Sequence, residues 1–441
     1  MSFLDNILFA LLLAVGIGYF TMNVKKLMRN INLGRDVNRK DHSSERWKNM
    51  IMVALGQSKM VKRPVAGVLH IIVYAGFVII NIEVIEIIID GLFGTHRVLS
   101  FMGSFYSILI ASFEILAVLV LVAVLIFWIR RNAIKLTRFS SSDLNGAPRN
   151  DANYILYFEV VLMSLFLLMN AADFQLQQLG IGHYDQVGSF PISKFIAPFF
   201  NGMSELRIIL IERTAWWLHI IGILIFLNYL YFSKHLHILL AFPNTFFADL
   251  NAKGKLDNLE SVTNEVKLMM DPNVDPFAAP ADPEAVPAKF GASDVQDLNW
   301  VQLLNAYSCT ECGRCTSACP ANQTGKKLSP RKIMMDTRDR LEEVGKNRDA
   351  NKGIFIPDGK SLLNDYITTE ELWACTSCNA CVEECPISIS PLSIIIDMRR
   401  YLVMEQSAAP TELNTVMTNI ENNGAPWQYN QMDRFNWSSE A

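Results

Sequence analysis

All eight cysteines of this 441-residue chain fall into two copies of one spacing pattern. The copies read CTECGRCTSACP, from Cys309 to Pro320, and CTSCNACVEECP, from Cys375 to Pro386. In each copy three closely spaced thiolates can bind three corners of one [4Fe–4S] cluster. The fourth cysteine, which is followed by proline, ligates the other cluster in two-cluster ferredoxins. The duplicated pattern therefore predicts two [4Fe–4S] clusters that share their motifs.

This spacing assigns four thiolates to each predicted cluster. The cluster I thiols are those of Cys309, Cys312, Cys315 and Cys385. The cluster II thiols are those of Cys375, Cys378, Cys381 and Cys319. Structural zinc is the alternative, but a zinc ion takes four ligands and has no use for a third regularly spaced cysteine followed by Cys-Pro. No cysteine remains for a disulfide framework, and free thiolates indicate a reducing compartment.

Each cluster motif is followed by a predicted amphipathic helix with the same kind of start. Ser329 and Ser390 are favourable N-cap residues, and each precedes a proline at the first helical position. Basic residues of these helices are expected on exposed faces, namely Arg331, Lys332, Arg399 and Arg400. No nucleotide-binding loop or Ser/His/Asp arrangement accompanies the clusters, so the domain is predicted to relay electrons, with substrate chemistry elsewhere.

The first half of the chain is far more apolar than the second. The whole chain is 51% hydrophobic and 19% charged, whereas soluble domains have about 25% charged residues. Five stretches reach the length of about 20 apolar residues that a membrane-spanning helix needs. They are approximately 3–20, 65–89, 103–129, 154–176 and 214–242. The predicted fold is mainly α-helical: a five-helix transmembrane bundle followed by a cytoplasmic α-helical dicluster ferredoxin domain.

Basic residues are concentrated in the first and third predicted loops, from Lys25 to Arg63 and from Arg130 to Arg149. The positive-inside rule places these loops in the cytoplasm and the N-terminus outside. Topology accounts for the basic residues, and the net charge is only −4, so no nucleic-acid partner is expected. We expect a multi-pass protein of the bacterial inner (plasma) membrane, in contact with lipid and quinone.

Histidines in the apolar segments could bind haem. His219 and His237 are five helical turns apart if the fifth helix is continuous, which places them on one face about 27 Å apart. His70 and His237 lie at a similar expected depth near the inner ends of their helices, so the two imidazoles can bind one haem iron from both sides. The alternative is a hydrogen bond to a neighbouring residue or a lipid headgroup. His235 is expected to point elsewhere.

His219 has no histidine partner at its expected depth in the second helix. Three alternatives remain open: a second haem is absent, its other ligand is Met163 or Met169, or His219 hydrogen-bonds a quinone headgroup. The loop histidines His42, His96 and His183 are expected to be solvated. Buried acidic residues are costly in a membrane and are candidates for a proton path. They are Glu83, Glu86, Glu114, Glu159 and Asp173.

Composition divides the chain into four segments. Residues 1–242 form the transmembrane, cytochrome b-like domain, and residues 243–298 form a linker that is proline-rich at 271–290. Residues 299–405 form the ferredoxin-like domain with two [4Fe–4S] clusters. The polar tail, 406–441, carries Trp427 and Trp437 and is expected to dock on a partner subunit.

The membrane half resembles the cytochrome b subunit shared by respiratory nitrate reductases (the gamma subunit) and membrane-bound heterodisulfide reductases. This resemblance rests on five spans, an outside N-terminus, His70, His219 and His237, the last within SKHLHILLAFP. The C-terminal half resembles HdrC, the small iron–sulfur subunit of heterodisulfide reductase, through both cysteine motifs, LSPRKIMMDTR and ENNGAPW. The chain thus looks like a fusion of the two.

The resemblance implies haem b, a quinone substrate and a separate cytoplasmic, heterodisulfide reductase-like subunit with CCG motifs that carries out the substrate chemistry. The expected function is a membrane-bound electron-transfer subunit of an oxidoreductase, linking the quinone pool through haem b and two [4Fe–4S] clusters to that partner. A redox-sensing or anchoring protein without turnover is the alternative. Solute transport is disfavoured because the spans show no paired buried charges and no broken helices.

Overall fold

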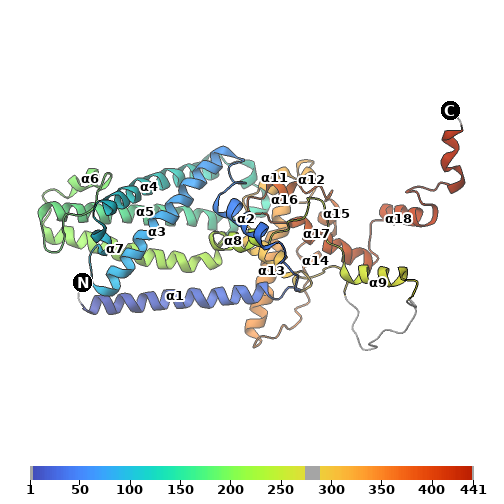
Figure 1. Cartoon of the computed structure of the whole chain (residues 1–441), viewed down its shortest axis with the longest axis horizontal. Coiled ribbons are helices and arrows are strands. Elements are labelled where there is room, and N and C mark those ends of the chain that lie inside the picture. Colours follow the sequence, from blue (N-terminus) through green and yellow to red (C-terminus); the bar gives the residue numbers. More distant parts are fainter. Residues whose placement is uncertain (1–2, 274–288, 440–441) are drawn as a thin grey trace.

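The computed structural model describes residues 3–273 and 289–439, in which every regular element is a helix. A bundle of long helices and a compact helical domain lie end to end, and the C-terminal segment extends away from both (Figure 1). The prediction of a mainly α-helical chain with five apolar helices is confirmed. The proline-rich stretch predicted at 271–290 lies almost wholly outside the described residues.

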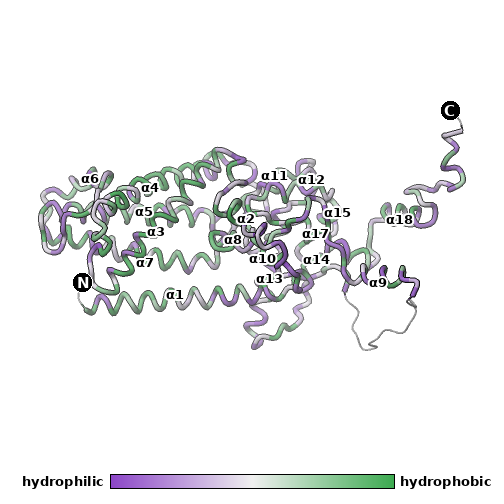
Figure 2. The backbone as a smooth tube through the Cα atoms, in the orientation of Figure 1, coloured by the Kyte–Doolittle hydropathy of each residue, from purple (hydrophilic) through white to green (hydrophobic). Residues whose placement is uncertain are grey.

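Five long helices build the bundle. They are α1 (Phe3–Ile31), α3 (Pro64–Phe93), α4 (Ser104–Trp128), α5 (Ala147–Leu179) and α7 (Glu205–Tyr229). Helix α5 packs against α4 and α7, while α3 packs against α1 and α4. Each of the five is long and apolar enough to cross a membrane, and their hydrophobic character is visible along the bundle (Figure 2). Because α1 continues to Ile31, the bases Lys25, Lys26 and Arg29 belong to a helix and not to the predicted loop.

The fifth helix differs most from its prediction. Helix α7 begins at Glu205 and ends at Tyr229, and after a 3₁₀ turn Ser233 takes an extended conformation (φ −120°, ψ 147°). A separate helix, α8 (His237–Phe246), then starts at His237. The Ser233 side chain stabilises the break because it accepts a hydrogen bond from the His235 backbone N–H at 3.1 Å, as an N-cap does. The prediction that His219 and His237 share one face of a continuous helix is therefore wrong.

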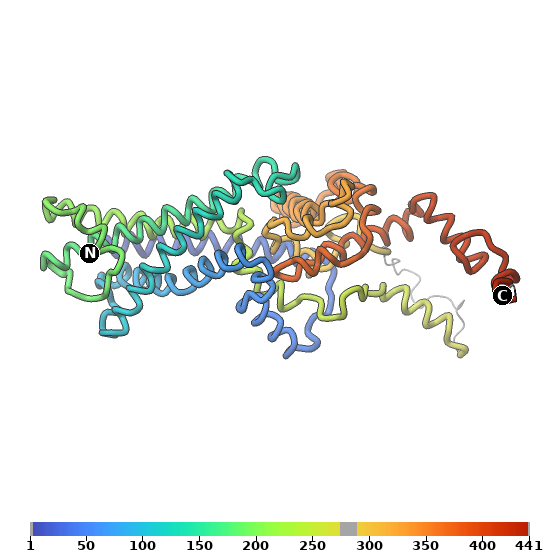
Figure 3. Tube along the Cα trace, turned by 90° about the horizontal axis from the view of Figure 1, so that it is seen from above, coloured from blue at the N-terminus to red at the C-terminus, as the bar shows by residue number. Residues whose placement is uncertain are grey.

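The chain runs alternately up and down the bundle. The first and third loops lie at the end that contacts the compact domain, which we call the cluster end (Figure 3). The chain N-terminus, the loop 94–103 and the connection 180–204 lie at the opposite, distal end (Figure 1). The two loops rich in basic residues thus share one end of the bundle with the C-terminal half, which is the arrangement that the charge pattern predicts.

Among the described residues, the compact domain contains eight helices. They are α10 (Trp300–Ser308), α11 (Arg314–Ala318), α12 (Pro320–Gln323), α13 (Pro330–Ala350), α14 (Leu362–Asp365), α15 (Thr369–Trp373), α16 (Ala380–Glu384) and α17 (Pro391–Arg400). As predicted, Ser329 caps α13 and Ser390 caps α17, each through its side chain and a backbone N–H. Helix α11 packs on α16, and α13 packs on α17. The duplicated sequence therefore forms a structure with two matching halves.

The remaining helices are shorter and lie around these two bodies. They are α2 (Ser43–Met50), α6 (Ser193–Ile196), α9 (Glu260–Met270) and α18 (Thr411–Asn423), with one-turn π segments at Ile51–Leu55, Ile129–Ala133 and Tyr401–Glu405. Short 3₁₀ turns occur at Val98–Met102, Thr137–Phe139, Ser142–Leu144, Ala197–Phe200, Leu230–Phe232, Lys234–Leu236, Val295–Asp297 and Gln431–Ser438. The last of these and α18 form the tail, in which Trp427 and Trp437 are exposed.

Buried polar contacts fix the compact domain on the bundle. Arg331, expected on an exposed face, is only 1% exposed and donates to the Asp143 carboxylate from Nε at 3.0 Å and from Nη2 at 2.6 Å. Asn30 donates to the Tyr307 hydroxyl at 3.0 Å. Because Asp143 belongs to the third loop and Asn30 to α1, the orientation of the domain is set by the membrane half.

Candidate electron-transfer site

The cluster I thiols gather around one cavity at the cluster end. Cys309, Cys312, Cys315 and Cys385 all line it, although Cys385 is distant from the others in sequence. Gly313 makes the tight turn between the first and second pairs possible, since its φ is +71° and a side chain there would meet Arg331 Nη1 at 2.6 Å. The fold thus brings the fourth cysteine of the second motif to the first three of the first motif.

The surroundings of these thiols favour a cationic cofactor. Burial raises the pKa of Cys309 to about 12 and that of Cys385 to about 11. Four thiolates could not be buried together here without a compensating positive charge, which the irons of a cluster would supply. Ile389 also donates its backbone N–H to Cys385 Sγ at 3.3 Å, a type of bond that tunes iron–sulfur clusters. The donor set therefore fits an iron–sulfur cluster.

The cluster II thiols form a second group on the outer side of the domain. Burial raises the pKa of Cys381 to about 12, and the neighbouring thiols of Cys375, Cys319 and Cys378 contribute to the rise. Asn379, with φ of +61°, takes the place that Gly313 holds in the first motif. Cys378 is exposed. This donor set also fits an iron–sulfur cluster, one closer to solvent.

The two groups of thiols meet where α11 packs on α16. Cys381 of the second motif borders the cluster I cavity and is an electrostatic neighbour of Cys315. Within the described residues, no three His, Cys, Asp or Glu side chains converge closely enough to hold a single metal ion. That finding concerns mononuclear sites, whereas a four-iron cluster holds its ligands further apart.

The structure brings His70 and His237 together. Their ring centroids are 6.3 Å apart, with an angle of 44° between the ring planes. Two imidazoles bound to one metal from opposite sides, at metal–nitrogen distances of about 2.0–2.1 Å, have ring centres about 6 Å apart. His237 Nδ1 lies 3.1 Å from the Lys234 carbonyl oxygen, which leaves Nε2 for a metal. His70 Nδ1 is buried without a partner. The pair therefore fits the two axial ligands of a haem.

The other two histidines of this region do not match their predictions equally well. His219 is 2% exposed, its Nδ1 has no hydrogen-bond partner, and the ring beside it, at 6.0 Å, is that of Phe166. His235, expected to point elsewhere, lies 5.5 Å from the His237 ring. The sequence argument missed this contact because it assumed a continuous helix.

The histidine pair and the cluster I loop are directly connected. Arg314 lies between Cys312 and Cys315, and its guanidinium reaches the Lys59 and Met60 carbonyl oxygens at 3.4 and 3.5 Å. The same guanidinium is an electrostatic neighbour of His70. On the other side, Lys234, whose carbonyl holds His237, forms an ion pair with Glu311 of the same loop. The cluster I thiols therefore lie closer to the histidine pair than the motif alone indicates.

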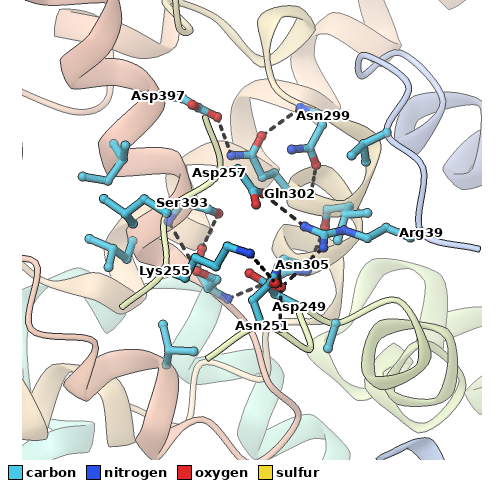
Figure 4. A pocket seen from close by; sticks show the side chains of 18 of the residues that line it. Arg39, Asp249, Asn251, Lys255, Asp257, Asn299, Gln302, Asn305, Ser393 and Asp397 are labelled. Atoms are coloured by element: carbon cyan, nitrogen blue, oxygen red, sulfur yellow. Dashed lines mark hydrogen bonds and ion pairs between the residues drawn. The ribbon is translucent and has the colours of Figure 1, made fainter. Parts of the chain in front are cut away.

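A polar cavity of about 400 Å³ lies beside the domain, between loop 1, the segment after α8, α10 and α17. Figure 4 shows that its charged side chains point toward one another. Gln302 donates to Asp397 at 2.8 Å, and Arg39 pairs with Asp257 at 3.3 Å. Because these groups satisfy each other, the cavity places no free reactive group beside the thiols.

The distal end contains buried charges that the sequence analysis did not anticipate. Arg97, in a loop, is 6% exposed and pairs with the buried Asp173 of α5. His96, expected to be solvated, is largely buried and lies 3.7 Å from the same carboxylate. The premise that paired buried charges are absent is therefore wrong.

Comparison with known proteins agrees with the thiol geometry. Residues 308–389 match a protein family described as a 4Fe-4S dicluster domain. The chain is also similar to HdrC of the ferredoxin/F420H2-dependent CoB-CoM heterodisulfide reductase of Methanosarcina acetivorans. The two are 36% identical over 108 residues, which are 24% of this chain and 52% of that relative.

Longer relatives align with almost the whole chain. It is 31% identical to the probable iron-sulfur-binding oxidoreductase FadF of Bacillus subtilis, over 99% of this chain and 61% of FadF. It is 28% identical to the EtfAB:quinone oxidoreductase of Syntrophomonas wolfei, over 92% of this chain and 55% of that protein. The chain thus spans little more than half the length of these relatives. No solved structure matches it significantly. The chain contains a 4Fe–4S dicluster domain and is similar to iron–sulfur oxidoreductases of the FadF kind and to HdrC of heterodisulfide reductases.

Proposed function

We propose that this protein is the membrane-bound electron-transfer subunit of an oxidoreductase complex. Electrons pass between the quinone pool and a cytoplasmic partner through haem b, held by His70 and His237, and two [4Fe–4S] clusters. The division into segments 1–242, 243–298, 299–405 and 406–441 belongs to this proposal, as do an outside N-terminus and a place in the bacterial inner membrane.

One observation carries the proposal: the histidine pair, the cluster I thiols and the cluster II thiols follow one another from the bundle to the outer surface. Arg314 connects the first two groups, and the contact of Cys315 with Cys381 connects the second and third. A haem here would supply a one-electron carrier between the bilayer and cluster I. An anchoring protein would have no need for such a sequence of redox sites.

The protein's own residues have distinct tasks in this relay. Lys234 orients His237 through its carbonyl group and holds the cluster I loop through its ammonium group. Arg314 keeps that loop on the membrane half. Cys378 is exposed, so cluster II would exchange electrons with the partner. The aromatic tail, with Trp427 61% exposed, is proposed to bind the same partner.

The relatives' names bear on the two substrates. The similarity to an EtfAB:quinone oxidoreductase over 92% of the chain supports quinone as the membrane-side reactant. The similarity to HdrC supports a heterodisulfide reductase-like subunit with CCG motifs as the soluble partner. EtfAB, printed in the name of the longer relative, is the second candidate for that partner.

The test is reduction of the purified protein by a quinol analogue, followed by visible and EPR spectroscopy. The haem and both clusters should become reduced, whereas an anchoring protein would show no change. His237→Ala should abolish the b-type haem absorbance and cluster reduction by quinol, while dithionite still reduces both clusters. His42→Ala, at an exposed histidine, should behave as wild type. A full b-type spectrum in His237→Ala would refute the haem assignment.

A further inference from the structure

A small polar cavity lies inside the distal end of the bundle, remote from the redox sites described above. Its charged lining comes from α3, α5, α7 and the loop 94–103, through Glu83, Glu86, Asp90, His96, Arg97, Asp173, Glu212 and Arg213. It offers about 30 Å³ to water-sized molecules, and about 10–15 Å³ is enough for one water. The cavity therefore suits water and protons, and it is too small for a quinone ring.

The carboxylates of α3 nearest the loop are well supplied with donors. Glu86 accepts from the Leu99 backbone N–H at 2.9 Å and from the Tyr106 hydroxyl at 3.0 Å. Asp90 accepts from Thr95 Oγ1 at 2.5 Å and from the Arg97 backbone N–H at 2.7 Å. Both groups are therefore stabilised as carboxylates.

The carboxylates of α5 and α7 are equally well paired. Asp173 accepts from Arg97 Nε and from Gln177 at 3.4 Å. Glu212 accepts from the Tyr184 hydroxyl at 3.1 Å and pairs with Arg213. Outside the cavity, Glu114 accepts from Ser193 and the backbone of Ile192. These groups also retain their negative charge.

Glu83 is the exception. It is 3% exposed, lines the cavity, and its Oε2 has no hydrogen-bond partner. Five carboxyl groups line the cavity against two guanidinium groups, those of Arg97 and Arg213, and such an excess of negative charge is strongly unfavourable when buried. Since Glu83 alone lacks a donor, it is the carboxyl group that most readily takes up a proton.

A route leads from Glu83 to the distal surface. Glu83, Glu86 and Asp90 are three and four residues apart, so they share one face of α3. Beyond them, His96 contacts Asp173 and the exposed His183, whose ring lies 5.1 Å away. Burial lowers the pKa of His96 to about 4, so at neutral pH its imidazole has one donor and one acceptor nitrogen. It can therefore pass a proton between the network and the surface.

We propose that this network is a proton pathway and that Glu83 is its inner proton-holding group. The inference rests on the proposed quinone chemistry. Oxidation of one quinol sends two electrons through the haem to the clusters and releases two protons, which leave through Glu83 and His96 at the distal face. Quinone reduction takes the reverse route. Electrons and protons therefore leave the bundle at opposite ends.

The test uses wild-type protein and Glu83→Gln in liposomes that contain the pH dye pyranine, with duroquinol as donor and external ferricyanide as acceptor. Ferricyanide reaches only molecules whose clusters face outward, and their distal ends face the lumen. Wild-type turnover should acidify the lumen. Glu83→Gln should lower turnover on the order of 100-fold, as loss of a proton-transfer group does, while haem and cluster spectra stay unchanged.

Glu205→Gln, at an exposed carboxylate of the same end, is the matched control and should turn over normally. Wild-type turnover and lumen acidification in Glu83→Gln would overturn the pathway, as would proton release on the cluster side. If the wild-type protein itself fails to oxidise quinol, the proposed function fails. The proton site is then decided by infrared spectroscopy, in which Glu83→Gln should lack one protonated carboxyl band; an unchanged spectrum would overturn it.

Discussion

The two cysteine motifs have nearly the same sequence, yet they lie in different surroundings. The cluster I thiols face the bundle and have four cationic electrostatic neighbours, Lys59, Arg138, Arg314 and Arg338. The cluster II thiols lie toward solvent and have Arg399 beside Cys375. Because charge and exposure set the reduction potential of an iron–sulfur cluster, one repeated motif provides two different redox sites.

This difference has a direct consequence for the relay. Three of the four cations near cluster I come from the membrane half or contact it, since Lys59 and Arg138 belong to its loops and Arg314 binds the Lys59 carbonyl. Docking therefore raises the potential of cluster I and shields it from solvent. Cluster II is left accessible to a partner. The membrane half acts as part of the environment of cluster I as well as an anchor.

The largest expected effect comes from exchanging a ligand between the two sites. Cys319→Ser lies in the first motif, but it should destroy cluster II and leave cluster I, because Cys319 neighbours Cys375 and Cys381. Iron should fall from about eight to about four atoms per chain, with the EPR signal of one cluster remaining. Ser317→Ala, at an exposed neighbour, should retain both signals. Loss of the buried cluster instead would contradict the shared ligation.

A smaller effect is expected from weakening the contact that shields cluster I. Asp143→Asn leaves the guanidinium of Arg331, 1% exposed, without its carboxylate, which should cost about 3 kcal/mol of docking free energy. Cluster I should then lose iron to a chelator as readily as cluster II does, as measured by the decay of each EPR signal. Lys327→Gln, which removes an exposed ion pair with Glu370, should change neither rate. Equal protection of cluster I in Asp143→Asn would show that this ion pair does not maintain the difference.

The smallest effect concerns the potentials themselves. Arg314→Gln removes a buried charge beside Cys312 and Cys385 and should lower the midpoint potential of cluster I by about 50 mV, the size of a Coulomb interaction over several ångströms at a dielectric constant of about 20. Arg399→Gln should shift only cluster II. Potentiometric EPR titration measures both. If Arg314→Gln and Arg399→Gln shift the same cluster, the assignment of surroundings is wrong.

Local sequence patterns predicted most of the secondary structure. The apolar runs predicted five long helices, and Ser329 and Ser390 start the predicted helices. Burial of an apolar helix and capping by a serine depend on residues close in the sequence, so a single sequence reveals them. The break at Ser233 was missed because it also depends on Asp151 of another helix, which accepts from the Lys234 backbone N–H at 3.2 Å.

The sequence by itself determined which chemistry this protein can support. Eight thiols in two motifs specify iron–sulfur clusters, because the spacing of ligands within a loop is local information. Only the tertiary structure decided the surroundings: Arg331 against Asp143, Arg314 beside His70, His235 beside His237 and Glu83 without a donor. The physical reason is that a buried charge or imidazole is stabilised by whatever group folding brings to it, and such partners are tens to hundreds of residues away in the sequence.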